Sequence, residues 1–205
     1  MHAQATDPIV SRRKFDRELH EFKALAADYR GRGWFLIESD FPKVFLIASA
    51  PQLKPPAIVT GVVFDYTDYD FKPPSVRLVD PFTREPYLMK NSPVSLIRQT
   101  EIEAPLPLGI QLPPGAQIAK MIQRQSLMQA YGPDDIPFLC LAGVREYHDH
   151  PGHSGDAWEL HRTSGAGRLV RIIEVIDTYG VRPLTGYNVT LVPQVAGFLE
   201  NEVPR

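Results

Sequence analysis

The chain has 205 residues, of which 43% are hydrophobic and 22% charged, so it can bury one sizeable core but is short for two. Its formal net charge of −2 leaves no overall basic surface, and nucleic acid and anionic membranes are therefore not favoured partners. It has no apolar run near the roughly 20 residues that span a bilayer and no secretory signal pattern, so we expect one cytoplasmic domain over residues 1–205.

The first predicted element is an amphipathic helix over about residues 11–31. Apolar side chains recur there at intervals of four and three residues, and charged side chains occupy the other faces. The apolar set is Phe15, Leu19, Phe22, Ala26 and Tyr29.

Four strands are predicted next, at residues 34–38, 44–48, 57–66 and 75–79. The first two are short apolar runs joined by a turn, and the third is rich in β-branched side chains. The fourth follows Pro73-Pro74, whose fixed φ angles and missing N–H groups prevent ordinary pairing. A helix on a four-stranded antiparallel meander is an α+β arrangement.

A proline-rich segment at about residues 88–135 is predicted to be an insertion outside the main core. Between Gly115 and Tyr131 its apolar side chains follow a helix-like period, which predicts a short helix. A structureless loop of this size is unusual in a compact domain, so we expect a functional or partner-contacting role, as a lid, a docking surface or an assembly interface.

The last third contains a polar cluster at residues 145–158, with three histidines and one tryptophan. A second helix is predicted after it, with Leu169, Ile172, Ile173 and Ile176 on one face and an end at Gly180 and Pro183. Residues 187–192 are predicted to form one more strand.

A proline-pair turn, a Cys-Leu pair and a tryptophan ahead of a helix follow one another in the chain. They are Tyr69-Asp70-Phe71-Lys72-Pro73-Pro74, Cys140-Leu141 and Trp158. Over residues 15–183, this order resembles the ubiquitin-conjugating enzyme superfamily. It is most similar to divergent prokaryotic members, which accompany ubiquitin-like proteins and their activating enzymes in bacterial modification or antiviral defence systems.

The resemblance implies the ubiquitin-conjugating fold, with Cys140 in an irregular crossing between the sheet and the second helix. It also implies a transferase in which Cys140 carries a ubiquitin-like modifier as a thioester. The partners would be the modifier, its activating enzyme and a target protein amine, and no cofactor or metal is implied. Cys140 is the only cysteine of the chain and lies between two leucines. The alternative to a catalytic role is that it is a small buried apolar side chain of the core.

One part of the family pattern is missing. The usual histidine-proline-asparagine triplet should follow the fourth strand, but residues 80–87 contain no asparagine to stabilise an oxyanion. His148 and His150, eight and ten residues after Cys140, are the candidates for acid–base or oxyanion help, with His148 favoured.

Other interpretations of the same residues stay open. His148, His150 and His153 with Asp156 offer nitrogen and oxygen ligands, and so a metal-dependent hydrolase is one alternative, although the spacing matches no established zinc motif. A module that binds a ubiquitin-like protein without catalysis is another. In a third, the histidines lie in a solvated loop and have a structural role.

Overall fold

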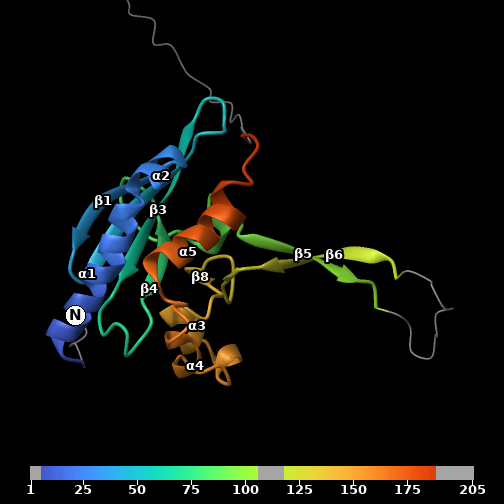
Figure 1. The fold of residues 1–205 in the computed structure, drawn as a ribbon. Helices are drawn as coiled ribbons and strands as arrows, with labels where there is room; N and C mark the ends of the chain where they lie inside the picture. Colours follow the sequence, from blue (N-terminus) through green and yellow to red (C-terminus); the bar gives the residue numbers. More distant parts are fainter. Residues whose placement is uncertain (1–5, 106–117, 188–205) are drawn as a thin grey trace, which may run out of the picture.

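The computed structural model describes residues 6–105 and 118–187. They form an α+β fold in which two helices precede a four-stranded antiparallel sheet (Figure 1). The helices and strands are α1 Pro8–Ala24, α2 Ala26–Gly31, β1 Trp34–Asp40, β2 Lys43–Ala50, β3 Ala57–Asp65, β4 Ser75–Val79, β5 Ile97–Glu103, β6 Lys120–Ser126, β7 Met128–Gln129, β8 Phe138–Leu139, α3 Arg145–Asp149, α4 Glu159–Arg162 and α5 Leu169–Ile176. Short 3-10 turns η1 Met89–Asn91 and η2 Pro151–His153 and a π-helical turn η3 Asp177–Val181 complete the set.

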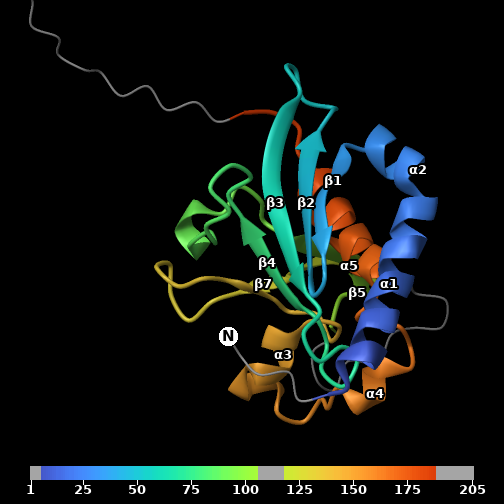
Figure 2. The ribbon, with the colours of Figure 1, turned by 90° about the vertical axis from the view of Figure 1, so that its left-hand side faces the viewer.

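The predicted four-stranded meander is confirmed, with strand order β1-β2-β3-β4. Helices α1 and α5 lie on one side of this sheet (Figure 2). Their apolar faces bury Phe15, Phe22 and Ile172 against the sheet, where Trp34 and Leu46 are fully buried. Each such side chain contributes roughly 1.5–3 kcal/mol through burial, so the core lies between the sheet and these two helices.

The predicted first helix is two helices. Asp7 caps α1 by accepting a hydrogen bond from the Ile9 amide, and Pro8 occupies the first turn, so the helix starts before residue 11. The chain leaves the helical path at Leu25 before α2 begins. On the two sides of this break, Tyr29 stacks on Phe22 with ring centroids 4.8 Å apart. The second predicted helix is confirmed as α5.

The helix predicted between Gly115 and Tyr131 is wrong, because residues 120–126 form strand β6. This strand pairs antiparallel with β5, and the two make an arm that projects from the body of the protein (Figure 1). The helix-like period combined side chains that serve two different places. Met121 and Ile122 are exposed on the arm, whereas Leu127 and Met128 are buried in the core. The strand predicted at residues 187–192 lies outside the described residues, apart from Tyr187.

The segment at residues 88–135 was predicted to lie outside the core, and for part of it this prediction is wrong. Val94, Leu96, Leu127 and Met128 are buried in the same cluster as the helices and the sheet. The β5–β6 arm stands apart from it, because no side chain in its two strands is buried. No helix in the described ranges has the length and apolarity needed to cross a membrane.

Removing the arm is expected to leave the fold intact. Residues 99–124 can be replaced by Asn-Gly, which joins Arg98 to its paired residue Gln125 through a two-residue hairpin turn. Because none of the removed side chains that the structure describes is buried, we expect the free energy of unfolding to change by no more than about 1 kcal/mol. Denaturant titration followed by tryptophan fluorescence measures this change.

Deletion of residues 92–114 is the comparison, because it also removes Val94 and Leu96. Loss of large core side chains costs about 2–5 kcal/mol each, so this variant is expected to lose cooperative unfolding. Equal stability of the two deletions would contradict the placement of these residues in the core.

Candidate functional site

The proline-pair turn, the segment after Cys140 and Trp158 meet in space. The Arg145 amide donates to the carbonyl of Pro74 at 2.9 Å, and its guanidinium donates to the carbonyl of Pro73 at 3.2 Å. The indole N–H of Trp158 donates to the carbonyl of Asp70 at 2.9 Å. Arg145 begins α3 directly after the thiol segment, so these bonds hold that segment against the turn.

Cys140 follows β8 and its side chain is half-buried. Its amide donates to the carbonyl of Leu127 at 2.8 Å, which fixes the backbone. Two nitrogens lie at its sulfur: Nε2 of Gln129 at 3.2 Å and Nε2 of His153 at 3.6 Å. Burial raises the pKa of the Cys140 thiol, and the nearby charge of Arg98 offsets part of this rise.

The ring of His153 is held by its neighbours. It stacks on Tyr147 with ring centroids 4.0 Å apart and an interplanar angle of 21°. The Tyr147 hydroxyl donates to a carboxylate oxygen of Asp156 at 2.6 Å, and the other oxygen contacts His161. The bond from Tyr147, followed by that from His161, lowers the pKa of Asp156, while the bond to Asp156 raises the pKa of Tyr147 to about 12.

His148 and His150, the histidines favoured from the sequence, have other contacts. The two ring nitrogens of His148 lie 2.8 Å from the carbonyl of Ala142 and 2.9 Å from that of Asp156. His150 is stacked on Tyr131 and accepts a hydrogen bond from the Gly152 amide at 3.1 Å. The structure therefore brings His153, and neither of these, to the sulfur.

The histidine cluster does not converge on a common point. Among residues 6–105 and 118–187, no group of three or more His, Cys, Asp or Glu side chains is arranged to hold a metal ion. The nitrogens of His148 face two backbone carbonyls, which are partners for N–H groups and not for a ligand lone pair.

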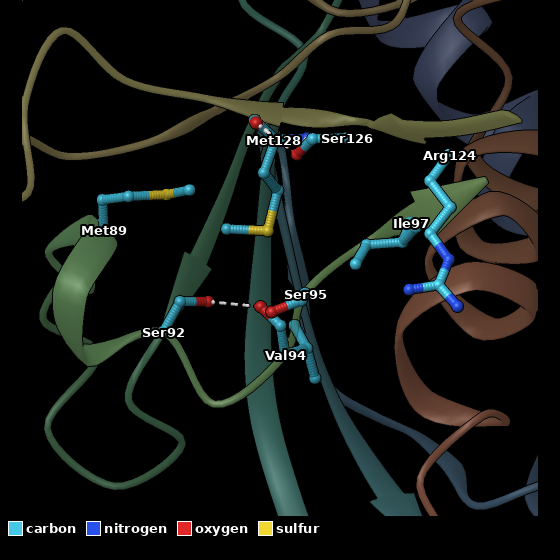
Figure 3. A pocket seen from close by; sticks show the side chains of 8 residues that line it. All are labelled: Met89, Ser92, Val94, Ser95, Ile97, Arg124, Ser126 and Met128. Carbon is cyan, nitrogen blue, oxygen red and sulfur yellow. Dashed lines mark hydrogen bonds between the residues drawn. The ribbon is translucent and has the colours of Figure 1, made fainter. Parts of the chain in front are cut away.

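An apolar pocket of about 220 Å³ lies at the base of the arm (Figure 3). Met89, Val94, Ile97 and Met128 line it, with the stem of Arg124 at its rim. Side chains alternate along a strand, and Gln129, next to Met128, contacts Cys140. The pocket therefore opens on the side of β7 away from the thiol.

Comparison with known proteins places the chain in a family. The model of the Y4jH-like family matches residues 6–184. The chain is also 43% identical over 201 residues to a protein of Sinorhizobium fredii named "uncharacterized protein y4jH", and the alignment covers 96% of this chain and 94% of that protein. The chain belongs to the Y4jH-like family. The matched region includes Gln129, Cys140 and His153, so the whole arrangement at the sulfur lies within the Y4jH-like part of the chain.

Sequence reasoning had found Cys140 but gave His153 only to the metal interpretation and did not consider Gln129. A signal for Gln129 exists in hindsight. It is the second residue of β7, where a polar side chain follows the buried Leu127 and Met128, and its amide nitrogen lies 3.2 Å from the sulfur of Cys140. In this Y4jH-like chain, an amide nitrogen thus lies at the sulfur although the expected asparagine is absent.

Proposed function

We propose that this protein is a conjugating enzyme of the ubiquitin-like type, in which Cys140 carries a ubiquitin-like modifier as a thioester. The observation that carries the proposal is the setting of Cys140. It is the chain's only cysteine, it is half-buried, and an imidazole and an amide nitrogen lie 3.6 Å and 3.2 Å from its sulfur. The proline-pair turn and Trp158, packed beside the thiol segment, support it further.

The reaction has two acyl transfers. In the first, Cys140 loses its proton to His153 and its sulfur attacks the thioester carbonyl on the activating enzyme, whose cysteine leaves as a thiolate. In the second, His153 has released its proton to solvent, a target amine attacks the new carbonyl and gives a proton to His153 as the C–N bond forms, and the C–S bond breaks so that Cys140 leaves as a thiolate. A thioester suits both steps because it keeps the acyl group reactive and releases a good leaving group.

The site residues have separate roles in this proposal. His153 replaces His148 and His150 as the acid–base group, because its Nε2 is the imidazole nitrogen at the sulfur. The amide of Gln129 donates to the oxyanion of the tetrahedral intermediate, the part played by an asparagine in the family that the sequence resembles. His148 positions the segment after Cys140 through the carbonyl of Ala142.

The test is a search for the thioester itself. The tagged protein is expressed in its native host and lysed at low pH without thiols, and adducts are separated on a non-reducing gel. We expect one adduct that disappears with thiol reagent and that mass spectrometry places on Cys140 through the C-terminus of a ubiquitin-like protein. Cys140→Ser should give a thiol-resistant oxyester instead, because an alkoxide is a poorer leaving group.

Cys140→Ala serves as the control and should form no adduct. A thiol-labile adduct undiminished in this variant would end the proposal. A wild-type protein that binds a ubiquitin-like protein without any covalent adduct would make it a non-catalytic binding module.

A further inference from the structure

A second pocket, of about 200 Å³, lies directly beyond Cys140 and is distinct from the apolar one at the base of the arm. Leu141, Ala142 and Gly143, which directly follow Cys140, line it. Arg98 from β5 and Arg171 from α5 also line it, and no carboxylate side chain of residues 6–105 or 118–187 does. The pocket therefore has a positive lining next to the thiol.

The two arginines differ from most others in the described part of the chain. Arg98 lies over the ring of Tyr179, 5.4 Å from its centroid, and Arg171 donates to the carbonyl of Ser164 at 3.0 Å. Neither has an acidic partner within residues 6–105 and 118–187. By contrast, eight other arginines in those ranges pair with carboxylates: Arg12, Arg17, Arg32, Arg77, Arg84, Arg162, Arg168 and Arg182.

The other basic side chain of the lining, His161, contacts the carboxylate of Asp156, which does not line the pocket. The apolar side chains of Leu141, Ile172 and Val175 also line the pocket. A lining that combines aliphatic side chains with two guanidinium groups suits a short aliphatic stem that ends in a carboxylate. Arginine binds this group well, because its planar fork matches the two carboxylate oxygens.

We propose that this pocket binds a glutamate or aspartate side chain of the acceptor polypeptide, close to the amine that takes the acyl group from Cys140. The inference rests on the proposed function. The two guanidinium groups of this pocket, neither of which has a carboxylate partner in the described ranges, repel a solitary lysine ammonium group, and a carboxylate next to that lysine removes the repulsion. Acidic acceptor segments are then selected over neutral ones.

The charge of the pocket can be tested without any modifier or acceptor. Cys140 is alkylated with 3-maleimidopropionic acid and, separately, with the uncharged amide of this acid. The rate with the acid is divided by the rate with the amide, and this quotient is divided by the same quotient for glutathione to give the maleimide ratio. Taking the ratio removes any effect of a variant on the ionisation of the thiol. We expect the acid to be favoured about tenfold at low salt and less at high salt.

Matched variants locate the effect. Arg98→Gln and Arg171→Gln are each expected to bring the ratio most of the way to one, whereas Arg98→Lys keeps part of the preference. Arg124→Gln is the control, because it removes a charge from β6 on the side of the apolar pocket and should leave the ratio unchanged. A ratio near one in the wild-type protein, or one that Arg98→Gln and Arg171→Gln do not alter, overturns the pocket assignment.

The acceptor is tested by discharge of loaded protein onto two peptides that share one lysine and differ in having glutamate or glutamine beside it. We expect about tenfold faster discharge onto the glutamate peptide, and equal discharge in the Arg98→Gln, Arg171→Gln double variant. If the wild-type protein discharges equally onto both peptides and the double variant is loaded more slowly, the pocket binds a carboxylate of the modifier. This result overturns the proposal that it binds a carboxylate of the acceptor. A third outcome is that no thioester forms although the wild-type protein still prefers the acidic maleimide. This result overturns both the proposed function and the binding of an acceptor side chain, and it leaves the pocket as a site for carboxylates.

Discussion

Asp177→Ala is expected to lower the free energy of unfolding by about 3–5 kcal/mol, the usual cost of removing one partner from a buried charged network. Asp177 is 2% exposed, and its carboxylate accepts hydrogen bonds from the indole of Trp34 at 2.9 Å and from Arg32 at 2.6 Å. Arg182 also donates to it. These bonds tie the end of α5 to the start of β1. Urea titration of wild-type and variant protein measures the loss.

The same carboxylate predicts a dependence on pH. Burial raises the pKa of Asp177, but the bonds from Trp34, Arg32 and Arg182 outweigh it and hold the pKa below its ordinary value of 3.8. A lowered folded-state pKa gives stability that is present above the unfolded-state pKa and is lost as the pH falls through the folded-state value. The stability difference between wild type and Asp177→Ala should therefore shrink below about pH 4.

Asp16→Ala is the matched control for this network. Asp16 forms an exposed i,i+4 pair with Arg12, so its removal should cost no more than about 1 kcal/mol. An Asp177→Ala variant as stable as Asp16→Ala would show that the network contributes little.

The elements that the sequence predicts correctly are those whose local pattern of apolar side chains fits only one kind of secondary structure. The sheet strands and α5 were predictable because each presents one continuous apolar face to the core, as Ile172 and Ile173 show on α5. The arm was not, because its apolar side chains have no core to face. Met121 and Ile122 are exposed on the arm, so a periodicity argument that assumes burial fails there.

The candidate site was predictable only as far as the thiol. Which histidine faces Cys140 depends on how the segment after α3 turns, and that turn is fixed by bonds between residues distant from the sulfur. His148 is turned away by the carbonyls of Ala142 and Asp156, and His153 is turned inward by stacking on Tyr147. No spacing rule encodes these contacts, since they join side chains to backbone groups of a loop.

His153→Ala is expected to slow discharge of the Cys140 thioester onto an amine by about 10²-fold, the lower end of the range for loss of a general acid–base group. The reason is that the incoming amine must lose a proton as the C–N bond forms, and Nε2 of His153 is the imidazole nitrogen at the reacting sulfur. The measurement is a single-turnover chase of pre-loaded protein with free lysine, across a range of pH. The wild-type profile should contain an ionisation that is absent in the variant.

His148→Ala and His150→Ala separate this role from a structural one. His148→Ala removes contacts to two carbonyls, so we expect a loss of about 1–3 kcal/mol in the free energy of unfolding but a wild-type pH profile for discharge. His150→Ala should leave discharge closer to wild type than His153→Ala does, because the ring of His150 contacts those of Tyr131 and His153 whereas His153 itself lies at the sulfur. Discharge slowed 10²-fold by His148→Ala and unaffected by His153→Ala would return the acid–base role to the histidine favoured from the sequence alone.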